Sequence, residues 1–499
     1  MSRRITVGLI EVPNIALYDS QGANRAPRPN RNVLISKQVL MSNLEAGGFE
    51  VRLYNLKAGD WEHAYGEVPW KDGKLIKAMV GTDYRTISPD ECDVWGVTCN
   101  FQQHRNSARL IMQHLGGTGH PVIAGGSDVI AEPQLYLEAG ADAVVLDKSG
   151  AANWAVIDCL TGRSPRGELS GVLFRDGRRV PLRIRPTTPE QWALPSSEIA
   201  QQCMGMDYWA NSTPAELTPI GSVVTDIGCD RKCDFCQTPG YRLGYKAMSP
   251  QVIVDWFRSQ KDAGARSVVF SPDQFLARLL WDNGRDDILE AMAGIRGLDL
   301  SWMWPNGLEL RKMTWGRGYA DADLTPDEEL LNALIGWQGG KGCFHLYVPA
   351  ERPLNGRENY SKLLPWREHC DMMKAVVRTG VPALTYGCII GFEDDSDESL
   401  SQLEEGVGTL FEELRTINPA LDVQVAAYAL SPIPGTPQAA KVHSSGLVRF
   451  FDPEMLGGLW APCMDTRYLS YEQVSEWQRR LLRIGIGDHK SQFMNDVFQ

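Results

Sequence analysis

Three cysteines, Cys229, Cys233 and Cys236, stand close together in the segment CDRKCDFC. With 11 cysteines in 499 residues, the chain is too poor in cysteine for a disulfide scaffold, so this group is expected to bind metal or to react. Three thiolates on one loop can hold three irons of a [4Fe–4S] cluster and leave the fourth iron open to an outside ligand. The alternatives are a three-cysteine zinc site and three unrelated thiols. Zinc normally takes a fourth nearby ligand, and the spacing is not that of a zinc ribbon, so we predict an iron–sulfur centre.

The cysteine segment follows an apolar run, Ser222–Ile227, that is typical of a strand, and Gly228 lets the backbone turn out of it. Beyond it, apolar runs alternate with helix-length segments, which predicts parallel βα units and a partial or complete (β/α) barrel. Barrel chemistry lies at the carboxyl ends of the strands, so the cysteines are expected at the barrel mouth. The further expected strands are Ser267–Ser271, Asp299–Trp304, Cys343–Val348, Ala383–Ile390 and Val423–Leu430.

The first third of the chain shows the same alternation and predicts an α/β domain with a Rossmann-like parallel sheet. Next comes a different stretch, with a hairpin signal at Asp176-Gly177 and a linker rich in Thr, Pro and Ser. We therefore expect the N-terminal domain at 1–150, the hairpin and linker at 151–215, the barrel at 216–440 and a helical C-terminal extension at 441–499. The expected N-terminal strands are Ile5–Val12, Glu50–Tyr54, Asp93–Thr98, Pro121–Ala124 and Asp142–Leu146.

The composition, 43% apolar and 22% charged, is that of a soluble globular protein. The 50 Lys and Arg against 62 Asp and Glu give a net charge of −12, which argues against broad contact with nucleic acid. The mean hydropathy is −0.26, and no apolar run approaches the roughly 18 residues of a membrane helix. The short apolar run at the start meets Glu11 and Pro13, so it is interpreted as a strand rather than a targeting segment. The expected location is the cytoplasm, with no membrane and no nucleic acid partner.

The cysteine segment resembles the CxxxCxΦC signature of the radical S-adenosylmethionine (SAM) superfamily, with Phe235 as the aromatic residue. Further motifs follow in the family's order. Ser271–Phe275 stands where relatives carry the loop for the SAM amino group, Asn306-Gly307 ends the third barrel strand, and Glu351-Arg352 follows the fourth. The run Gly387–Asp394 resembles GxIxGxxE, and Pro434–Pro437 reads PGTP. The resemblance, over residues 215–440, implies SAM contacts at Phe235, Ser271, Asp273, Gln274, Asn306, Glu351, Gly387, Ile389 and Gly391.

The resemblance also implies the chemistry. The open iron chelates the amino and carboxylate groups of SAM, and an electron from the reduced cluster cleaves a C–S bond of the sulfonium. The usual products are methionine and a 5′-deoxyadenosyl radical, which abstracts hydrogen from an unactivated carbon. The protein supplies binding, orientation and shielding. A flavodoxin- or ferredoxin-type electron donor is the implied partner.

The N-terminal domain resembles the cobalamin-binding domain of B12-dependent radical SAM methyltransferases, through VIAGGSDV at Val122–Val129 and DAVVL at Asp142–Leu146. The family's Gly-Gly loop accommodates the nucleotide tail of cobalamin, and the loop after the third strand faces the lower side of the corrin. The sequence has no DxHxxG motif, so histidine ligation of cobalt is not expected. Asp147-Lys148-Ser149-Gly150 replaces the usual Gly-Glu after the fifth strand. The alternative is a domain that keeps the fold without the ligand. The implied cobalamin contacts are Thr98, Asn100, Gly125 and Gly126.

His345 and Tyr347 alternate with Cys343 along one expected strand, so all three are predicted to face the barrel interior. His345 and Tyr347 are candidates for substrate contact or proton transfer. Cys463 is a spare thiol that can quench a radical or bind a soft substrate atom. For each cysteine outside the cluster segment the alternative is burial as a small apolar side chain.

The function hypothesis from these patterns is cobalamin-dependent methylation of an unactivated carbon or phosphorus centre in a small metabolite, as in natural product biosynthesis. One SAM remethylates cob(I)alamin and another generates the radical. A second hypothesis is transfer of the 3-amino-3-carboxypropyl group of SAM, for example to arsenic, or a radical rearrangement or ring contraction beside a degenerate B12 domain. A third is a non-catalytic iron–sulfur or zinc protein.

Overall fold

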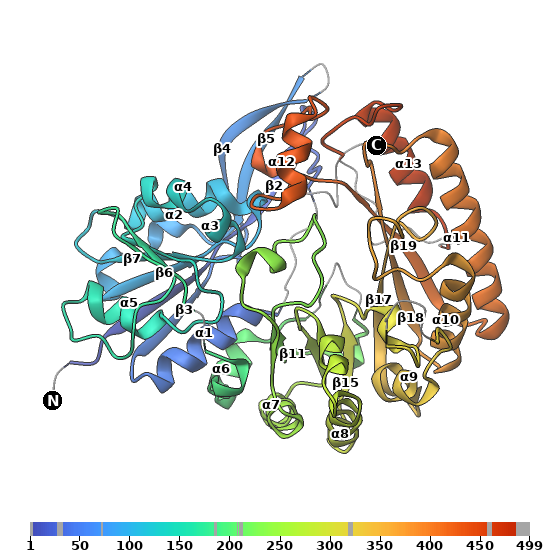
Figure 1. The fold of residues 1–499 in the computed structure, drawn as a ribbon. Helices are drawn as coiled ribbons and strands as arrows, with labels where there is room; N and C mark the ends of the chain where they lie inside the picture. Colours follow the sequence, from blue (N-terminus) through green and yellow to red (C-terminus); the bar gives the residue numbers. More distant parts are fainter. Residues whose placement is uncertain are drawn as a thin grey trace.

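The chain folds into two α/β halves that lie side by side, the N-terminal half in blue and cyan and the barrel half in green to red (Figure 1). The computed structural model describes residues 3–26, 33–70, 73–183, 187–206, 208, 213–317, 323–456 and 462–485. Within these ranges no helix is both long and apolar enough to span a bilayer.

The N-terminal half is built on a sheet with the strand order β10-β9-β8-β7-β6-β1-β3. The five expected strands are confirmed as parallel neighbours, and the Asp-Gly hairpin adds the antiparallel strands β9 and β10 beside β8. The chain reverses its direction of travel across the sheet between β1 and β6, which is where an open α/β sheet binds its ligand. The strands are β1 (Thr6–Glu11), β3 (Glu50–Asn55), β6 (Val94–Thr98), β7 (Val122–Gly125), β8 (Ala143–Val145), β9 (Val172–Phe174) and β10 (Arg179–Val180).

Helices cover this sheet (Figure 1). The helices of this half are α1 (Ile35–Ala46), α2 (Arg105–Leu115), α3 (Ser127–Ala131), α4 (Pro133–Glu138) and α5 (Asn153–Leu160), with α6 (Ser197–Cys203) leading into the barrel. The core on one face joins the strands to α2 and α4 through side chains such as Ile10, Val97, Ile111 and Tyr136.

A small antiparallel sheet, not anticipated from the sequence, follows β1 in the order β2-β5-β4. Its strands are β2 (Asn14–Tyr18), β4 (Trp61–Trp70) and β5 (Gly73–Gly81). Leu17, Val68 and Leu75 of this sheet pack against Met455 from the C-terminal part of the chain. The small sheet therefore joins the N-terminal half to the segment that follows the barrel.

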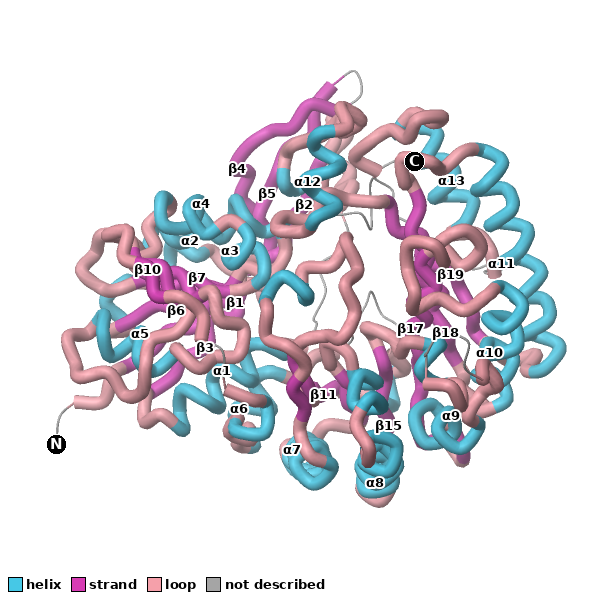
Figure 2. The backbone as a smooth tube through the Cα atoms, viewed as in Figure 1, coloured by secondary structure: helices cyan, strands magenta, loops and turns pink. Residues whose placement is uncertain are grey.

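The barrel strands all run parallel, in the order β11-β14-β15-β17-β18-β19. Among the described residues the first and last of these strands do not pair, so the sheet is an open arc, and the expected partial (β/α) barrel is confirmed. The helices lie along the outside of the arc (Figure 2). The strands are β11 (Ile220–Val223), β14 (Ser267–Phe270), β15 (Ser301–Trp304), β17 (Lys341–Glu351), β18 (Ala383–Ile390) and β19 (Asp422–Ala429).

The main hydrophobic core lies between these strands and the helices outside them. It is built around Trp256, Trp302 and Trp304, whose side chains are fully buried. The outer helices are α7 (Pro250–Asp262), α8 (Gly284–Arg296), α9 (Glu328–Ile335), α10 (Trp366–Arg378), α11 (Asp397–Ile417) and α13 (Tyr471–Leu481). The expected C-terminal extension is helical at α12 (Pro437–Ser444) and α13, and residues 486–499 lie outside the described ranges.

An irregularity in β17 overturns one expectation from strand alternation. The register against β15 shifts so that Trp302 lies opposite Cys343 and Met303 opposite His345. Because one extra residue stands between them, Cys343 packs in the outer core beside Trp302, whereas Phe344 packs with Met303 in a separate cluster. The prediction that Cys343 shares a face with His345 and Tyr347 is therefore wrong.

Candidate functional site

The cysteine loop leaves the short strand β12 (Asp226–Ile227), which pairs with β13 (Lys246–Ala247). Gly228 begins the loop with a left-handed backbone, φ 84°. A Cβ at this position would collide with the carbonyl oxygen of Gly244, so only glycine fits. The loop then runs between the two halves of the molecule, near the barrel mouth.

The three loop cysteines are partly exposed, free thiols. Burial raises the pKa of Cys229 to about 12 and also raises that of Cys233, and the nearby Cys236 adds to both shifts. The backbone N–H of Arg231 donates to the sulfur of Cys229 at 3.3 Å. Within the described ranges, no three His, Cys, Asp or Glu side chains are grouped tightly enough to enclose one metal ion. Three neighbouring, accessible thiols on one loop fit the ligand set of an iron–sulfur cluster, whose binding would deprotonate them.

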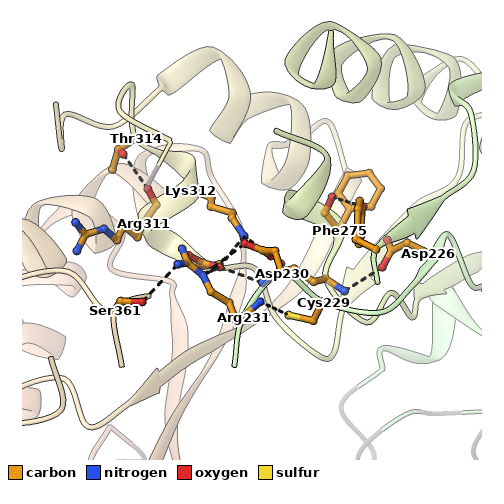
Figure 3. Close-up of polar contacts among 12 residues, drawn as sticks. Asp226, Cys229, Asp230, Arg231, Phe275, Arg311, Lys312, Thr314 and Ser361 are labelled. Atoms are coloured by element: carbon orange, nitrogen blue, oxygen red, sulfur yellow. Dashed lines mark hydrogen bonds and ion pairs between the residues drawn. The ribbon is translucent and has the colours of Figure 1, made fainter. Parts of the chain in front are cut away.

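A buried network of charges supports the first half of the loop (Figure 3). Glu309 is 4% exposed and accepts hydrogen bonds from Arg231 Nε and Gln274 Nε2, both at 3.1 Å. Lys312 lies 3.1 Å from the same carboxylate and 2.6 Å from Asp230. Both cations are thereby fixed beside Cys229, where they can balance the charge of bound thiolates.

A second ion pair supports the loop near Cys233. Lys362 Nζ donates to Glu351 at 2.6 Å, and its charge acts to lower the pKa of Cys233. The ammonium also lies 5.6 Å from the ring centroid of Phe235, which meets Tyr360 edge-on. Glu351 itself has a left-handed backbone, φ 56°, at the end of β17. The expected SAM contacts Phe235 and Glu351 are thus brought together beside the cysteines.

The expected loop for the SAM amino group lies against the start of the cysteine loop. Ser271 N–H continues the ladder by donating to Val223, and Gln274 N–H donates to the Asp226 carboxylate at 2.9 Å. Burial raises the pKa of Asp226 to about 7. Asp273 accepts from the backbone N–H of Gly228 at 2.8 Å. Asn306 Nδ2 reaches the Pro272 carbonyl at 3.3 Å, which links the third barrel strand to the same place.

The glycine motif on β18 has a steric role. A Cβ on Gly387 would occupy the position of the Tyr347 hydroxyl, so this glycine makes room for the phenol. Gly391 has φ 82°, and its N–H donates to Asp395 at 2.8 Å. Asp394, which stands at the final position of the motif, pairs with Arg352 at 3.1 Å. Ile389 packs in the apolar cluster that also contacts Phe235.

His345 and Tyr347 both avoid the outer core. His345 is 4% exposed, its Nε2 lies 2.8 Å from Thr385 Oγ1, and its Nδ1 has no hydrogen-bond partner among the described residues. Burial lowers the pKa of His345 to about 4, so the ring is neutral at pH 7. Tyr347 meets Tyr428 of β19 edge-on, with ring centroids 6.2 Å apart.

Cys463 is fully buried, and its thiol points to the Leu430 carbonyl oxygen at 3.7 Å. Burial raises the pKa of this thiol to about 12. Its neighbours include Phe392 and Val442, in the same apolar cluster that contacts Phe235. The structure thus places Cys463 in an apolar environment.

The expected cobalamin contacts gather at the carboxyl edge of the N-terminal sheet. Thr98 pairs with Gly125, and Ser127 N–H donates to Asn100 Oδ1 at 3.3 Å. Gly126 has φ 112° and packs so closely on the Cys99 carbonyl that a side chain would not fit. A Cβ on Gly125 would meet nothing within 4 Å, so the backbone there faces open space that a bulky ligand can approach.

Sequence reasoning missed several charged residues at these edges. Glu11, at the end of β1, binds the buried Lys37 at 2.9 Å and Lys57 at 2.7 Å, which hold the pKa of its carboxyl well below its usual range. Glu309 and Lys312 were likewise missed. Their only sequence signal is their position just after Asn306-Gly307, since they belong to no motif.

These features define a Rossmann-like domain joined to a partial (β/α) barrel with a three-cysteine loop. The fold is similar to that of TsrM from Kitasatospora setae, a radical SAM methyltransferase solved with tryptophan and a SAM analog. The TM-score is 0.60 at 15% identity, over 90% of this chain and 78% of that one.

OxsB, a cobalamin-dependent SAM radical enzyme solved with aqua-cobalamin and SAM, is also similar, with a TM-score of 0.66 at 14% identity. The alignment covers 95% of this chain and 66% of OxsB. No family model matches the chain, and no curated protein matches it in sequence. At such low identities the similarity establishes the shared fold.

Proposed function

We propose that this protein is a cobalamin-dependent radical SAM enzyme that methylates an unactivated carbon or phosphorus centre in a small metabolite. The observation that carries the proposal is the cysteine loop itself. Three interacting, accessible thiols stand at the barrel mouth, and Gln237, next to Cys236, donates to Pro434 at 2.8 Å and reaches Ser127 at 3.5 Å. The loop thus lies between the PGTP run of the barrel and the Gly-Gly loop of the N-terminal domain.

In this proposal Cys229, Cys233 and Cys236 hold a [4Fe–4S] cluster, which when bound supplies the electron that cleaves a C–S bond of SAM. The residues of the chain orient SAM and the cluster and shield them from water. Glu309 fixes Arg231 and Lys312 beside the cluster ligands, and Phe235, between Cys233 and Cys236, packs its ring against Tyr360. Asn306, Ser271, Gln274 and the β18 glycines line the approach proposed for SAM.

The Gly125-Gly126 loop is the proposed cobalamin site, supported by the open space over Gly125 and by the fold shared with OxsB. His345 and Tyr347 are proposed to face the substrate from the barrel side. The free Nδ1 of a neutral His345 can form a hydrogen bond with an uncharged polar group. Cys463, buried and paired with a carbonyl, is proposed to shape the apolar wall instead of reacting. A flavodoxin- or ferredoxin-type donor and a cytoplasmic location complete the proposal.

The test is made on protein purified without oxygen, reconstituted with iron and sulfide, incubated with hydroxocobalamin and passed through gel filtration. We expect about four irons and about one cobalt per chain. Reduced protein should convert SAM to 5′-deoxyadenosine. The Cys233→Ala variant is the matched control and should lose iron and SAM cleavage while keeping its circular dichroism spectrum.

Other outcomes would overturn parts of the proposal. Zinc without iron, or SAM cleavage by Cys233→Ala, would refute the cluster assignment. Iron without cobalt would refute the cobalamin site. Release of 5′-methylthioadenosine in place of 5′-deoxyadenosine would favour 3-amino-3-carboxypropyl transfer, a reaction that the altered Asp147–Gly150 loop leaves open.

A further inference from the structure

An ion pair between the two halves of the molecule ends at the cysteine loop. Lys148 comes from the loop after β8 of the N-terminal sheet, where it replaces a residue of the usual Gly-Glu pair. Its Nζ lies 3.1 Å from Asp273 Oδ1 and 3.5 Å from Oδ2, although the two residues are 125 positions apart in the chain. Asp273 belongs to the barrel, in the loop that follows β14.

Asp273 also contacts the cysteine loop. Its Oδ2 accepts the backbone N–H of Gly228 at 2.8 Å, and Gly228 directly precedes Cys229. Gly228 also packs closely against the Gly244 carbonyl. The hydrogen bond from its N–H to Asp273 therefore helps to fix the position of the next residue, Cys229. A continuous path therefore runs from Lys148 through Asp273 and Gly228 to the first cysteine.

Lys148 also reaches the far end of the same loop. Its Nζ lies 4.8 Å from the ring centroid of Tyr241, a few residues after Cys236. The side chain is 33% exposed. Burial acts to lower the pKa of Lys148, but Asp273 and the other groups around the ammonium raise this pKa overall. One cation thus contacts both the residue that holds the start of the cysteine loop and the aromatic ring at its end.

The loop that presents Lys148 is itself fixed. Asp147 Oδ1 accepts the N–H of Ser149 at 2.8 Å. The indole N–H of Trp192 donates to the Ser149 carbonyl at 3.1 Å. These contacts on both sides of Lys148 restrict its backbone, so the lysine is held at a defined position relative to the barrel.

We propose that Lys148 is a positioning residue that uses Asp273 to set the geometry of Cys229, so that the N-terminal domain controls how the cysteine loop receives SAM. The inference rests on the proposed function. It assigns a role to the segment in which this chain departs from the Gly-Glu pattern. Loss of the cation should leave the cluster ligands in place but loosen the Gly228 end of the loop.

The experiment uses the full-length chain in two states, the apoprotein and the reconstituted protein. In the apoprotein, alkylation of Cys229 by iodoacetamide is followed by peptide mass spectrometry. In the reconstituted protein, SAM affinity is measured by equilibrium dialysis, and the electron paramagnetic resonance spectrum of the reduced cluster is recorded with and without SAM. The variants are Lys148→Met, Lys148→Arg, Asp273→Asn and the Lys148→Met/Asp273→Asn double variant.

For Lys148→Met we expect faster alkylation of Cys229, unchanged iron content and SAM binding weakened about tenfold, the effect of losing one charge-assisted contact. Lys148→Arg should restore wild-type values. The double variant should be no worse than Asp273→Asn alone, because both substitutions break one path. Lys341→Met is the matched control, since Lys341 also pairs with an aspartate, Asp299 at 3.5 Å, but on the exposed surface.

Alkylation and SAM affinity equal to wild type in Lys148→Met would overturn the inference. Additive losses in the double variant would overturn the proposed path through Asp273. If Lys148→Met fails to fold, Lys148→Arg and Asp273→Asn are compared instead, by Cys229 alkylation and SAM affinity. Equal values for these two variants would overturn the inference. Failure of the proposed function is distinguishable, because it shows as absence of iron or SAM binding in the wild type, whereas the alkylation assay needs neither.

Discussion

At the residue scale, the cysteine loop depends on a network of paired charges centred on the buried Glu309 and Lys312. Glu309 accepts from Arg231, Lys312 and Gln274 while remaining 4% exposed. A buried carboxylate costs desolvation energy, and such an arrangement is stable only because several donors meet it at once. The network therefore holds the loop in one shape before any cofactor binds.

The first prediction concerns this carboxylate. Glu309→Gln removes one negative charge and leaves Arg231 and Lys312 to share Asp230, which lies 3.7 and 2.6 Å away. We expect the free energy of unfolding to fall by about 2 kcal/mol, because the buried Lys312 and the partly exposed Arg231 both lose the charge of the Glu309 carboxylate. Denaturant unfolding monitored by tryptophan fluorescence measures it. Glu290→Gln, at an exposed position on α8, is the control and should stay within about 0.5 kcal/mol of wild type. An equally small effect for Glu309→Gln would contradict the network.

Residue-scale chemistry was predictable only where it is contiguous in the sequence. Cys229, Cys233 and Cys236 form a pattern within a few positions, so their spacing alone indicates a cluster. The partners that support them come from distant parts of the chain, such as Glu309 and Lys148, and their roles depend on folding. No local signal marks a lysine that pairs across 125 positions.

At the element scale, the turn at Gly228 sets the direction in which the cysteine loop leaves β12. Gly228 leaves β12 with φ 84° and packs on the Gly244 carbonyl, next to the strand β13 that pairs with β12. The two glycines stand on opposite sides of one hairpin-like closure. Gly244 also has a left-handed backbone, φ 68°, but a Cβ there would meet nothing within 4 Å. The chain therefore offers a matched pair of positions.

The second prediction compares Gly228→Ala with Gly244→Ala. Both pay the cost of a left-handed alanine, about 1 kcal/mol, but only Gly228→Ala also forces a Cβ into a backbone carbonyl. We expect Gly244→Ala to bind iron normally, with a slightly lower melting temperature. Gly228→Ala should lose at least about 3 kcal/mol of stability or most of its iron on reconstitution. Calorimetry measures the stability of both variants, and iron analysis measures their iron content. Equal values for the two variants would show that the contact between Gly228 and Gly244 does not position the loop.

The succession of strands and helices along the chain was predictable because apolar runs and helix-length segments alternate over most of it. The small antiparallel sheet and the register shift in β17 were not predicted, for physical reasons. Most of strand β4 is partly or fully exposed and the strand contains glycine and proline, whereas β5 is mostly buried but is interrupted by Lys77, so neither strand gives a long apolar run. The extra residue in β17 reverses the facing of Cys343, and a strict alternation of faces cannot reveal a register shift.

At the scale of the whole molecule, a buried polar cluster joins the N-terminal half to the segment after the barrel. Glu454 is fully buried and accepts from Tyr65 at 2.6 Å and from Asn106 at 3.0 Å. Lys77 of β5 lies 2.7 Å from Asp452 and 3.6 Å from Glu454. Burial and the neighbouring Asp452 raise the pKa of Glu454 from 4.5 to about 7. This junction is therefore most stable when Glu454 carries a proton.

The last prediction follows from the sign of that shift. A carboxyl whose pKa is higher in the folded state stabilises the fold fully below its unfolded pKa, and this contribution is lost as the pH rises through the folded value. We expect the wild type to lose about 3 kcal/mol between pH 4.5 and pH 7 from this group. Glu454→Gln mimics the protonated form, because its amide can donate to Asp452 while its oxygen accepts from Tyr65 and Asn106.

The variant should therefore melt at a higher temperature than wild type at pH 8, and this difference should shrink as the pH approaches 5. Lys77 keeps Asp452 as its partner, so no cation is left unpaired in the variant. Glu476→Gln on α13, where Glu476 pairs with Arg479 on the exposed surface, should follow the wild-type pH profile. Calorimetric melting curves at pH 5, 6, 7 and 8 decide the matter. A variant that is less stable than wild type at pH 8 would mean that the ionised carboxylate, and not the protonated one, holds the two halves together.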